Sequence, residues 1–220
     1  MGGKWNKKAG GHVFDEDVDG LLNGLFDEGE VINKKKEFGF FETPKELVER
    51  MAELAGLVQE HPAVKIDDYI LEPSAGMGAI ADVLVEKGCR KDHVWCVEVD
   101  EKRYKALGDK GYTVVNADFM SDEADKVFDT KFDKVIMNPP FTRGIDIDHV
   151  TQAFRFLKDG GTLVAVMSSG AMHNSSKKAT AFRKLMEENG RFEDIPAGMF
   201  KKSGTMVNTV LCIMQKGKNA

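Results

Sequence analysis

The chain has 220 residues, of which 42% are hydrophobic and 30% are charged, a balance typical of one globular domain with its own core. No apolar run reaches the roughly 18 residues that a membrane span requires, and the first residues lack the apolar centre of a signal peptide, so we expect a cytoplasmic protein without membrane contacts. The net charge of −5 argues against a non-specific nucleic-acid binder.

Residues 1–37 differ in composition from the rest of the chain. They are rich in Gly and Lys, and their apolar residues between positions 18 and 26 recur at helical spacing. Such a helix could cover the core or lie over a site as a lid or arm, and the sequence leaves both open. We assign residues 38–220 to one domain, because the sequence has no internal repeat.

A helix signal opens this domain. Thr43 and Glu46 form a capping box around Pro44, which suits the first helical position. Apolar residues then recur at helical spacing, and the His61-Pro62 pair ends the pattern. The sequence predicts a helix that continues to about Gln59.

From residue 69 onward, short strands alternate with helices. Strands are predicted at 69–71, 93–97, 112–115, 132–137, 162–167, 192–195 and 206–214, and helices end near 87 and span 101–110, 148–157 and 177–188. This alternation indicates an α/β fold, in which helices cover both faces of a mostly parallel, seven-stranded sheet with a terminal antiparallel strand pair.

Polar residues stand at the carboxyl ends of four of these strands, where binding sites of parallel sheets lie: Glu72, Glu98, Asp118 and Asn138. Singly, each is explained as an ordinary strand-end residue. Together they favour a site in which Glu98 accepts both hydroxyls of a ribose and Asp118 accepts an adenine amine beside Phe119.

The turn Glu72-Pro73-Ser74-Ala75-Gly76-Met77-Gly78 joins a strand to a helix. Its glycines would let the backbone approach a ligand where a Cβ would clash. The turn departs from the dinucleotide fingerprint, and its acid lies where a pyrophosphate would sit, which argues against NAD. Glu72 suits a cationic amino-acid head group, although a purely structural turn also explains the glycines.

The segment Asn138-Pro139-Pro140-Phe141 leaves a buried strand in a stiff conformation, because two prolines fix two φ angles. The side-chain oxygen of Asn138 and the carbonyl of Pro139 would present two acceptors to an amino group. Phe141 would then stack on the planar group that carries this amine. The alternative is an ordinary Pro-rich turn after a strand.

Five segments in this order, Phe-Glu-Thr-Pro, Glu-Pro-Ser-Ala-Gly-Met-Gly, Val-Glu-Val-Asp, Ala-Asp-Phe and Asn-Pro-Pro-Phe, resemble the S-adenosylmethionine-dependent amino-methyltransferases. The closest resemblance, over roughly residues 38–215, is to gamma-class adenine-N6 DNA methyltransferases. It implies a Rossmann-like class I methyltransferase domain that methylates the N6 amine of a flipped adenine in DNA, as in restriction-modification. Relatives with the same motif methylate guanine N2 of RNA or a protein glutamine amide, so these alternatives stay open, as do adenine in RNA and a non-catalytic cofactor-binding subunit.

The resemblance also implies residue roles. The catalytic residues would be Asn138, Pro139, Pro140 and Phe141. The cofactor S-adenosylmethionine would contact Thr43, Pro44, Glu72, Ser74, Ala75, Gly76, Gly78, Glu98, Asp118, Phe119 and Asn138. Phe141 and Phe200 would pack on the target base, and Lys201 and Lys202 would contact phosphate. A core phenylalanine is the competing interpretation of Phe200.

Two expectations concern partners and metals. Relatives with built-in sequence specificity carry a further recognition domain, and residues 1–220 contain none, so we expect a short or degenerate recognition site or a separate specificity subunit. Cys89, Cys96 and Cys212 lack the spacing of metal ligands, and we expect reduced, buried thiols and no metal.

Overall fold

The computed structural model describes residues 42–59, 61, 63–122, 126, 128, 130–196 and 208–217, and two short strands nearer the N-terminus. The chain divides into two compact units, Met1–Phe40 and Phe41–Ala220. In the first unit, β1 (Lys4–Asn6) pairs antiparallel with β2 (Gly11–Val13). The predicted helix between positions 18 and 26 lies outside the described residues.

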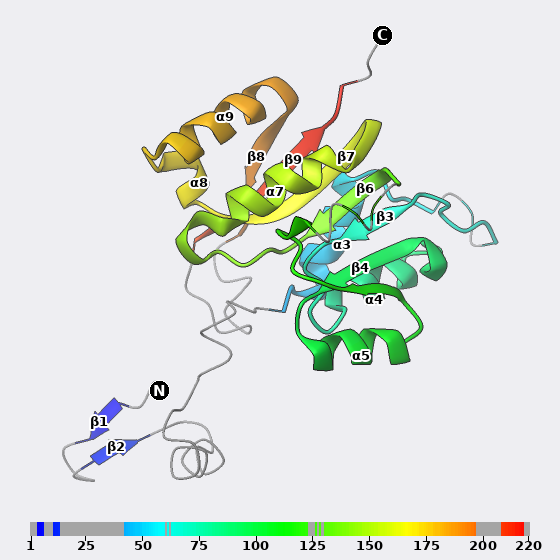
Figure 1. The fold of residues 1–220 in the computed structure, drawn as a ribbon, viewed down its shortest axis with the longest axis horizontal. Helices are drawn as coiled ribbons and strands as arrows, with labels where there is room; N and C mark the ends of the chain where they lie inside the picture. Colours follow the sequence, from blue (N-terminus) through cyan, green and yellow to red (C-terminus); the bar gives the residue numbers. More distant parts are fainter. Residues whose placement is uncertain are drawn as a thin grey trace. The chain divides into compact units, whose positions relative to one another are not determined.

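A seven-stranded sheet forms the centre of the second unit (Figure 1). In sheet order its strands are β5 (Thr113–Asn116), β4 (Val94–Glu98), β3 (Ile70–Glu72), β6 (Phe132–Met137), β7 (Leu157–Ser168), β9 (Thr209–Gln215) and β8 (Gly190–Asp194). The first five strands pair in parallel, and β9 runs antiparallel to both of its neighbours. The predicted sheet with its antiparallel pair is confirmed.

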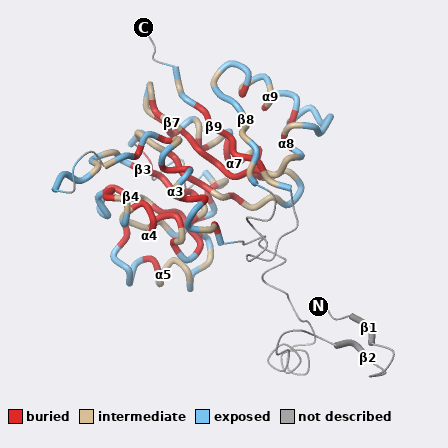
Figure 2. The backbone as a smooth tube through the Cα atoms, turned by 180° about the vertical axis from the view of Figure 1, so that it is seen from behind, coloured by how far each residue is buried: buried red, intermediate tan, exposed pale blue. Residues whose placement is uncertain are grey.

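Two clusters of apolar side chains cover the two faces of the sheet. Along β6 and β7, successive residues enter alternate clusters, as the pleat of a strand requires. The cluster on one face includes residues of α3 (Lys45–Leu54), α4 (Ala79–Glu86) and α5 (Glu101–Asp109), and the cluster on the other includes residues of α7 (Ile145–Arg155), α8 (Gly170–His173) and α9 (Lys177–Asn189). The middle strands are therefore buried along most of their length (Figure 2).

The predicted capping box is wrong. Pro44 is the N-cap of α3, and no side chain caps this end of the helix. The hydroxyl of Thr43 instead accepts a hydrogen bond from Asn138 (3.0 Å). The helix also ends at Leu54, earlier than predicted, because Gly56 adopts a left-handed conformation (φ 77°) that closes the last turn.

Other boundaries differ by a few residues. A 3-10 turn, η1 (Lys91–His93), precedes β4, so His93 lies outside that strand. Helix α7 begins at Ile145, before the predicted start at residue 148. A second 3-10 turn, η2 (Thr142–Gly144), leads into it, and Gly144 turns the chain through a left-handed conformation (φ 70°). Strand β7 begins at Leu157, which the sequence assigned to the preceding helix.

The three cysteines are buried free thiols, as predicted. Burial raises the pKa of the Cys89 thiol to about 12, so this thiol stays protonated and unreactive at neutral pH. Among the helices of the described residues, none combines the length and the apolarity needed to cross a membrane.

Gly190 provides a test of the sheet edge. A Cβ at this position would overlap the carbonyl oxygen of Ile213 on β9, although the backbone conformation itself (φ −171°) suits any residue. We expect Gly190→Ala to lower the free energy of unfolding by about 1–3 kcal/mol. Gly108→Ala is the matched control, since the added methyl group meets nothing within 4 Å and alanine favours the helix α5. Urea denaturation measures the free energy of unfolding of both variants and the wild type. If Gly190→Ala were as stable as the wild type, the close contact between Gly190 and Ile213 would be contradicted.

Candidate functional site

The parallel strands bring the predicted strand-end residues to one edge of the sheet. Glu72 and Glu98 are the last residues of the neighbouring strands β3 and β4. Asp118 follows β5, and Asn138 follows β6, which pairs with β3 on its other side. This edge therefore carries three carboxyl groups and one amide within four adjacent strands.

Between β3 and α4, the glycine turn adopts a left-handed conformation at both of its glycines. Gly76 has φ 56° and Gly78 has φ 86°, and both residues are buried. A Cβ on Gly78 would lie 2.9 Å from the side chain of Leu107, so the close packing of α5 also requires glycine here. The backbone N–H of Ala75 donates to the carbonyl of Val97 (3.0 Å), which fastens the turn to β4.

Glu72 is a buried acid, with 1% of its surface exposed. Its Oε2 atom accepts a hydrogen bond from the backbone N–H of Ala81 (3.0 Å) in the first turn of α4. Burial raises the pKa of the Glu72 carboxyl well above its usual value, and the charges of Asp82 and Glu98 raise it further against the effect of the Ala81 N–H. A cationic ligand group would lower the cost of ionising this carboxyl.

Glu98 is also buried and bonds the backbone on both sides of it. Its Oε2 atom accepts from the N–H of Gly76 (2.8 Å), and its Oε1 atom accepts from the N–H of Asp100 (2.9 Å). Arg103 adds an ion pair with Oε1 at 3.8 Å. Because a carboxylate oxygen accepts more than one hydrogen bond, these contacts are compatible with the predicted ribose role, which stays a prediction.

After β5, Asp118 and Phe119 point in different directions. Asp118 is exposed, and its Oδ1 atom accepts from the N–H of Met120 (2.9 Å). The ring of Phe119 is 2% exposed and packs against His149 and Phe156, with ring centroids 5.7 and 5.8 Å away. Asp118 thus remains available to a ligand, whereas the predicted adenine contact of Phe119 would have to involve its backbone.

His149 is a site residue that sequence reasoning missed. It lies on the buried face of α7, and its Nδ1 atom is 3.5 Å from the hydroxyl of Ser74 in the glycine turn. Burial lowers the pKa of His149, although Asp118 and Asp148 oppose this effect, so a neutral ring joins the turn to the loop after β5. Helical spacing of buried residues along α7 could have indicated its burial, but no local pattern links it to Ser74.

A hydrogen bond fixes the Asn-Pro-Pro-Phe corner. The Nδ2 atom of Asn138 donates to Oγ1 of Thr43, which is 6% exposed and stands directly ahead of Pro44. The first and the last of the five motif segments therefore meet. Pro139 is buried, and Phe141 is half-buried against the core cluster that includes α3. The Oδ1 atom of Asn138 is buried, so an incoming amine requires a movement of the atoms around it.

Not every predicted residue can be placed. Phe200, Lys201 and Lys202 lie outside the described residues. Pro140 and Ala75 lie within the corner and the glycine turn, but whether any of these residues contacts a ligand stays a prediction.

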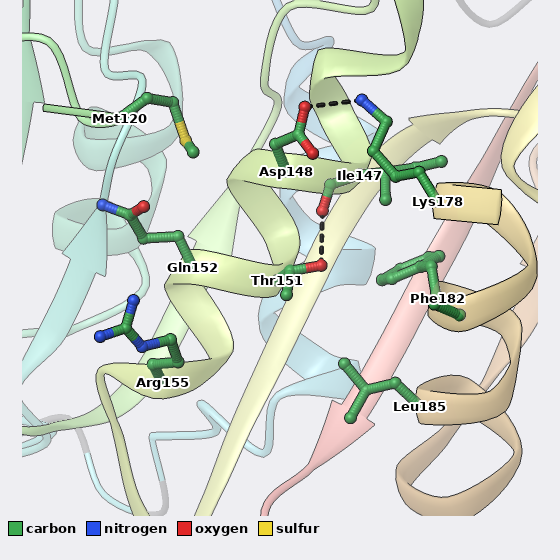
Figure 3. A pocket seen from close by; sticks show the side chains of 10 residues that line it. Met120, Ile147, Asp148, Thr151, Gln152, Arg155, Lys178, Phe182 and Leu185 are labelled. Atoms are coloured by element: carbon green, nitrogen blue, oxygen red, sulfur yellow. Dashed lines mark hydrogen bonds and ion pairs between the residues drawn. The ribbon is translucent and has the colours of Figure 1, made fainter.

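A hollow of about 400 Å³ lies between α7 and α9 (Figure 3). Its lining includes Phe182 and Leu185, with an ion pair between Asp148 and Lys178 (2.6 Å). None of the residues predicted for the site lines it.

Comparison with known proteins supports the family and the fold of the chain. A family model described as Methyltransferase small domain matches residues 55–193, which is more than half of the chain. A search of curated proteins found no significant match.

Three solved structures illustrate the structural likeness. The methyltransferase subunit of a type I restriction-modification system from Streptococcus thermophilus is 20% identical, over 82% of this chain and 45% of its own, with a TM-score of 0.65. A proposed class I S-adenosylmethionine-dependent methyltransferase from Listeria monocytogenes is 16% identical, over 90% of this chain and 66% of its own, with a TM-score of 0.61. A proposed RNA methyltransferase from Pyrococcus horikoshii is 18% identical, over 93% of this chain and all of its own (100%), with a TM-score of 0.57.

These matches confirm the predicted class I methyltransferase fold and imply S-adenosylmethionine as the cofactor. The chain spans 45% of the Streptococcus subunit and 66% of the Listeria protein. Identities of this size show a common fold and leave the substrate to be argued from the site.

Glu72 predicts a pH-dependent stability. The pKa of Glu72 is higher in the folded protein than in the unfolded chain, where it is near 4.5. The stabilising contribution of the protonated carboxyl is therefore complete below pH 4.5, and it is lost as the pH rises through the pKa of the folded protein. We expect Glu72→Gln, which keeps an acceptor for Ala81, to melt at a higher temperature than the wild type at pH 8, and the difference to shrink toward pH 4.5. The same variant should bind S-adenosylmethionine more weakly. A variant less stable than the wild type at pH 8 would show that Glu72 is ionised and well compensated.

Proposed function

Because this chain belongs to the methyltransferase small domain family, we propose that it transfers a methyl group from S-adenosylmethionine to the N6 amine of adenine in DNA. The observation that carries the proposal is the hydrogen bond between Asn138 and Thr43 (3.0 Å). It joins the Thr-Pro segment ahead of the glycine turn to the corner that would receive the target amine.

The strand-end residues fit S-adenosylmethionine. Glu72 is a buried carboxyl that a ligand ammonium group would compensate, and Asp118 is an exposed acceptor for the adenine amine. Glu98 would accept from the ribose while it holds Gly76. When bound, the cofactor supplies a methyl group activated by its sulfonium sulfur. Ser74, Ala75, Gly78 and Pro44 complete the proposed cradle.

The proposed role of the corner follows from the electronic structure of adenine. The N6 lone pair is delocalised into the ring, so the free amine is a poor nucleophile. Hydrogen bonds to Oδ1 of Asn138 and to the carbonyl of Pro139 would favour a pyramidal nitrogen and direct its lone pair toward the methyl group. Alignment of the reacting atoms would supply most of the acceleration, and the surplus proton would leave to water.

A base inside a duplex must leave the stack before it reaches such a corner, which costs a few kcal/mol. Stacking on Phe141 would offset part of this cost. The rigid Pro139-Pro140 backbone would keep the acceptors and the ring in a constant relation.

RNA is the second candidate substrate, and a specific observation favours it. The chain covers the whole of the proposed RNA methyltransferase from Pyrococcus horikoshii, whereas it covers less than half of the restriction-modification subunit. The resemblance of the Phe-Glu-Thr-Pro segment to adenine-N6 DNA enzymes favours DNA. Sequence specificity would then come from a separate subunit or from a short recognition site.

Nucleoside mass spectrometry decides between these substrates. DNA, RNA and protein are incubated with the chain and S-adenosylmethionine carrying a deuterated methyl group, and then digested. N6-methyladenine in DNA is the expected product. Label confined to RNA or protein would overturn the DNA assignment, and no label in the presence of proven cofactor binding would indicate a subunit that needs a partner.

Asn138→Ala should reduce methyl transfer by about 100-fold or more, because it removes one of the two acceptors for the amine. Binding of S-adenosylhomocysteine, measured by calorimetry, should change little. Asn189→Ala is a matched control, since Asn189 donates one hydrogen bond to the carbonyl of Leu185 at the end of α9, in a different part of the fold. A variant that loses cofactor binding together with activity would contradict an amine-specific role.

Phe141 tests the stacking step. Phe141→Trp should retain most of the activity, whereas Phe141→Ala should raise the KM for an oligonucleotide by about tenfold, a typical loss for one stacked base. Thermal melting of both variants controls for the contacts of this ring with the core. Equal KM values for the two variants would argue against stacking.

A further inference from the structure

Arg143 occupies an unfavourable backbone conformation beside the corner. It lies two residues after Phe141, with φ 56° and ψ 25°, and it is the one non-glycine residue with positive φ among the described residues. Glycine adopts this conformation at no cost, whereas a residue with a Cβ does not. The backbone at this position would therefore be less strained with glycine than with arginine, and the side chain of Arg143 is exposed, which points to a functional role.

One lysine of helix α9 lies close to the residue that follows Arg143. The Cε and Nζ atoms of Lys178, in the first turn of α9, lie 3.9 Å from the Cβ position of Gly144, the residue next to Arg143. Lys178 also pairs with Asp148 of α7 (2.6 Å, Figure 3), which offsets its charge. Lys177 precedes it and is exposed. Within the part of the chain that the structure describes, no carboxylate pairs with Arg143 or Lys177.

The loop that precedes α9 and its two lysines is held in place. Arg183 of α9 donates to the carbonyls of Asn174 (2.8 Å) and Ala171 (3.3 Å), so it closes the connection between α8 and α9. The hydroxyl of Ser176 accepts from the N–H of Ala179 (3.2 Å) and caps α9. A surface fixed in this way loses little entropy when a ligand binds.

We propose that Arg143 and Lys177, supported by Lys178, bind the phosphates of the polynucleotide strand on either side of the base that enters the corner. The inference rests on the proposed function and adds the contact surface for the strand. Phosphate contacts position a nucleic acid without reading its sequence, and an arginine can bind two phosphate oxygens at once. In a chain with a net charge of −5, a local group of cations beside the corner would hold the strand where the charge of the whole chain does not.

The salt dependence of binding tests this surface. The full chain with S-adenosylhomocysteine is titrated with a labelled DNA duplex, and with RNA of the same sequence, at several NaCl concentrations. We expect Arg143→Gly and Lys177→Ala each to weaken binding by about eightfold at 0.1 M salt and to reduce the slope of log K against log salt by about 0.9, the contribution of one phosphate contact on duplex DNA. Arg143→Lys should recover part of the affinity, because it restores the charge.

Two controls separate the surface from folding and from total charge. Arg143→Gly relieves the strained backbone, so its melting temperature should equal or exceed that of the wild type. Lys65→Ala removes an exposed cation ahead of β3, at the opposite edge of the sheet, and should bind like the wild type.

Wild-type slopes for both variants, with methylation of nucleic acid intact, would overturn the surface and leave the proposed function standing. A wild-type chain that binds S-adenosylhomocysteine but neither binds nor methylates any polynucleotide would overturn both.

Discussion

Two carboxyl groups buried at the same edge of the sheet, those of Glu72 and Glu98, constrain everything around them. Removing a carboxylate from water costs several kcal/mol unless hydrogen-bond donors replace the water. The backbone supplies these donors: Gly76 and Asp100 donate to Glu98, and Ala81 donates to Glu72. A turn that points N–H groups at the acids needs left-handed residues, which explains the glycines at positions 76 and 78.

The two acids differ in how the fold compensates them. Glu98 bonds backbone N–H groups through both oxygens and pairs with Arg103. Glu72 lies deeper, and burial raises its pKa despite the Ala81 contact. Ionised Glu72 therefore destabilises the folded protein, and a cationic ligand beside it would reduce this effect. Such a group makes the protein less stable without its ligand than it could be, which is a common cost of a functional site.

Local patterns predicted the strands because each is a short apolar run, and β6 has the predicted bounds of 132–137. The prediction failed where a side chain bonds a residue that is distant in the sequence and not one nearby. Thr43 has the sequence signature of a cap, but its hydroxyl bonds Asn138, 95 positions later. His149 likewise acquires its partner, Ser74, only when α7 packs against the sheet. The early end of α3 has a different cause. Gly56 is a typical helix-ending residue, but the prediction followed the apolar periodicity beyond it.

The order of the strands separates two kinds of chemistry along the same edge. From β3 the chain first forms β4 and β5 on one side and then returns to form β6, β7, β8 and β9 on the other, with β9 between β7 and β8. Glu72, Glu98 and Asp118 stand at the ends of β3, β4 and β5. Asn138 and Arg143 follow β6, and Lys177 follows β7. In the sequence, residues 1–139 carry 19 Lys and Arg against 29 Asp and Glu, and residues 140–220 carry 12 against 7.

This division suits a reaction between a cationic donor and an anionic acceptor. A ligand with a positive charge is favoured beside β3, β4 and β5, and a phosphate-bearing strand is favoured beside β6 and β7. The two regions meet between β3 and β6, where the strand order reverses and where the Asn138–Thr43 hydrogen bond lies. A methyl group passing from the cationic ligand to the anionic one would be transferred at this boundary. The reacting atoms would then lie where the acidic and the basic regions meet.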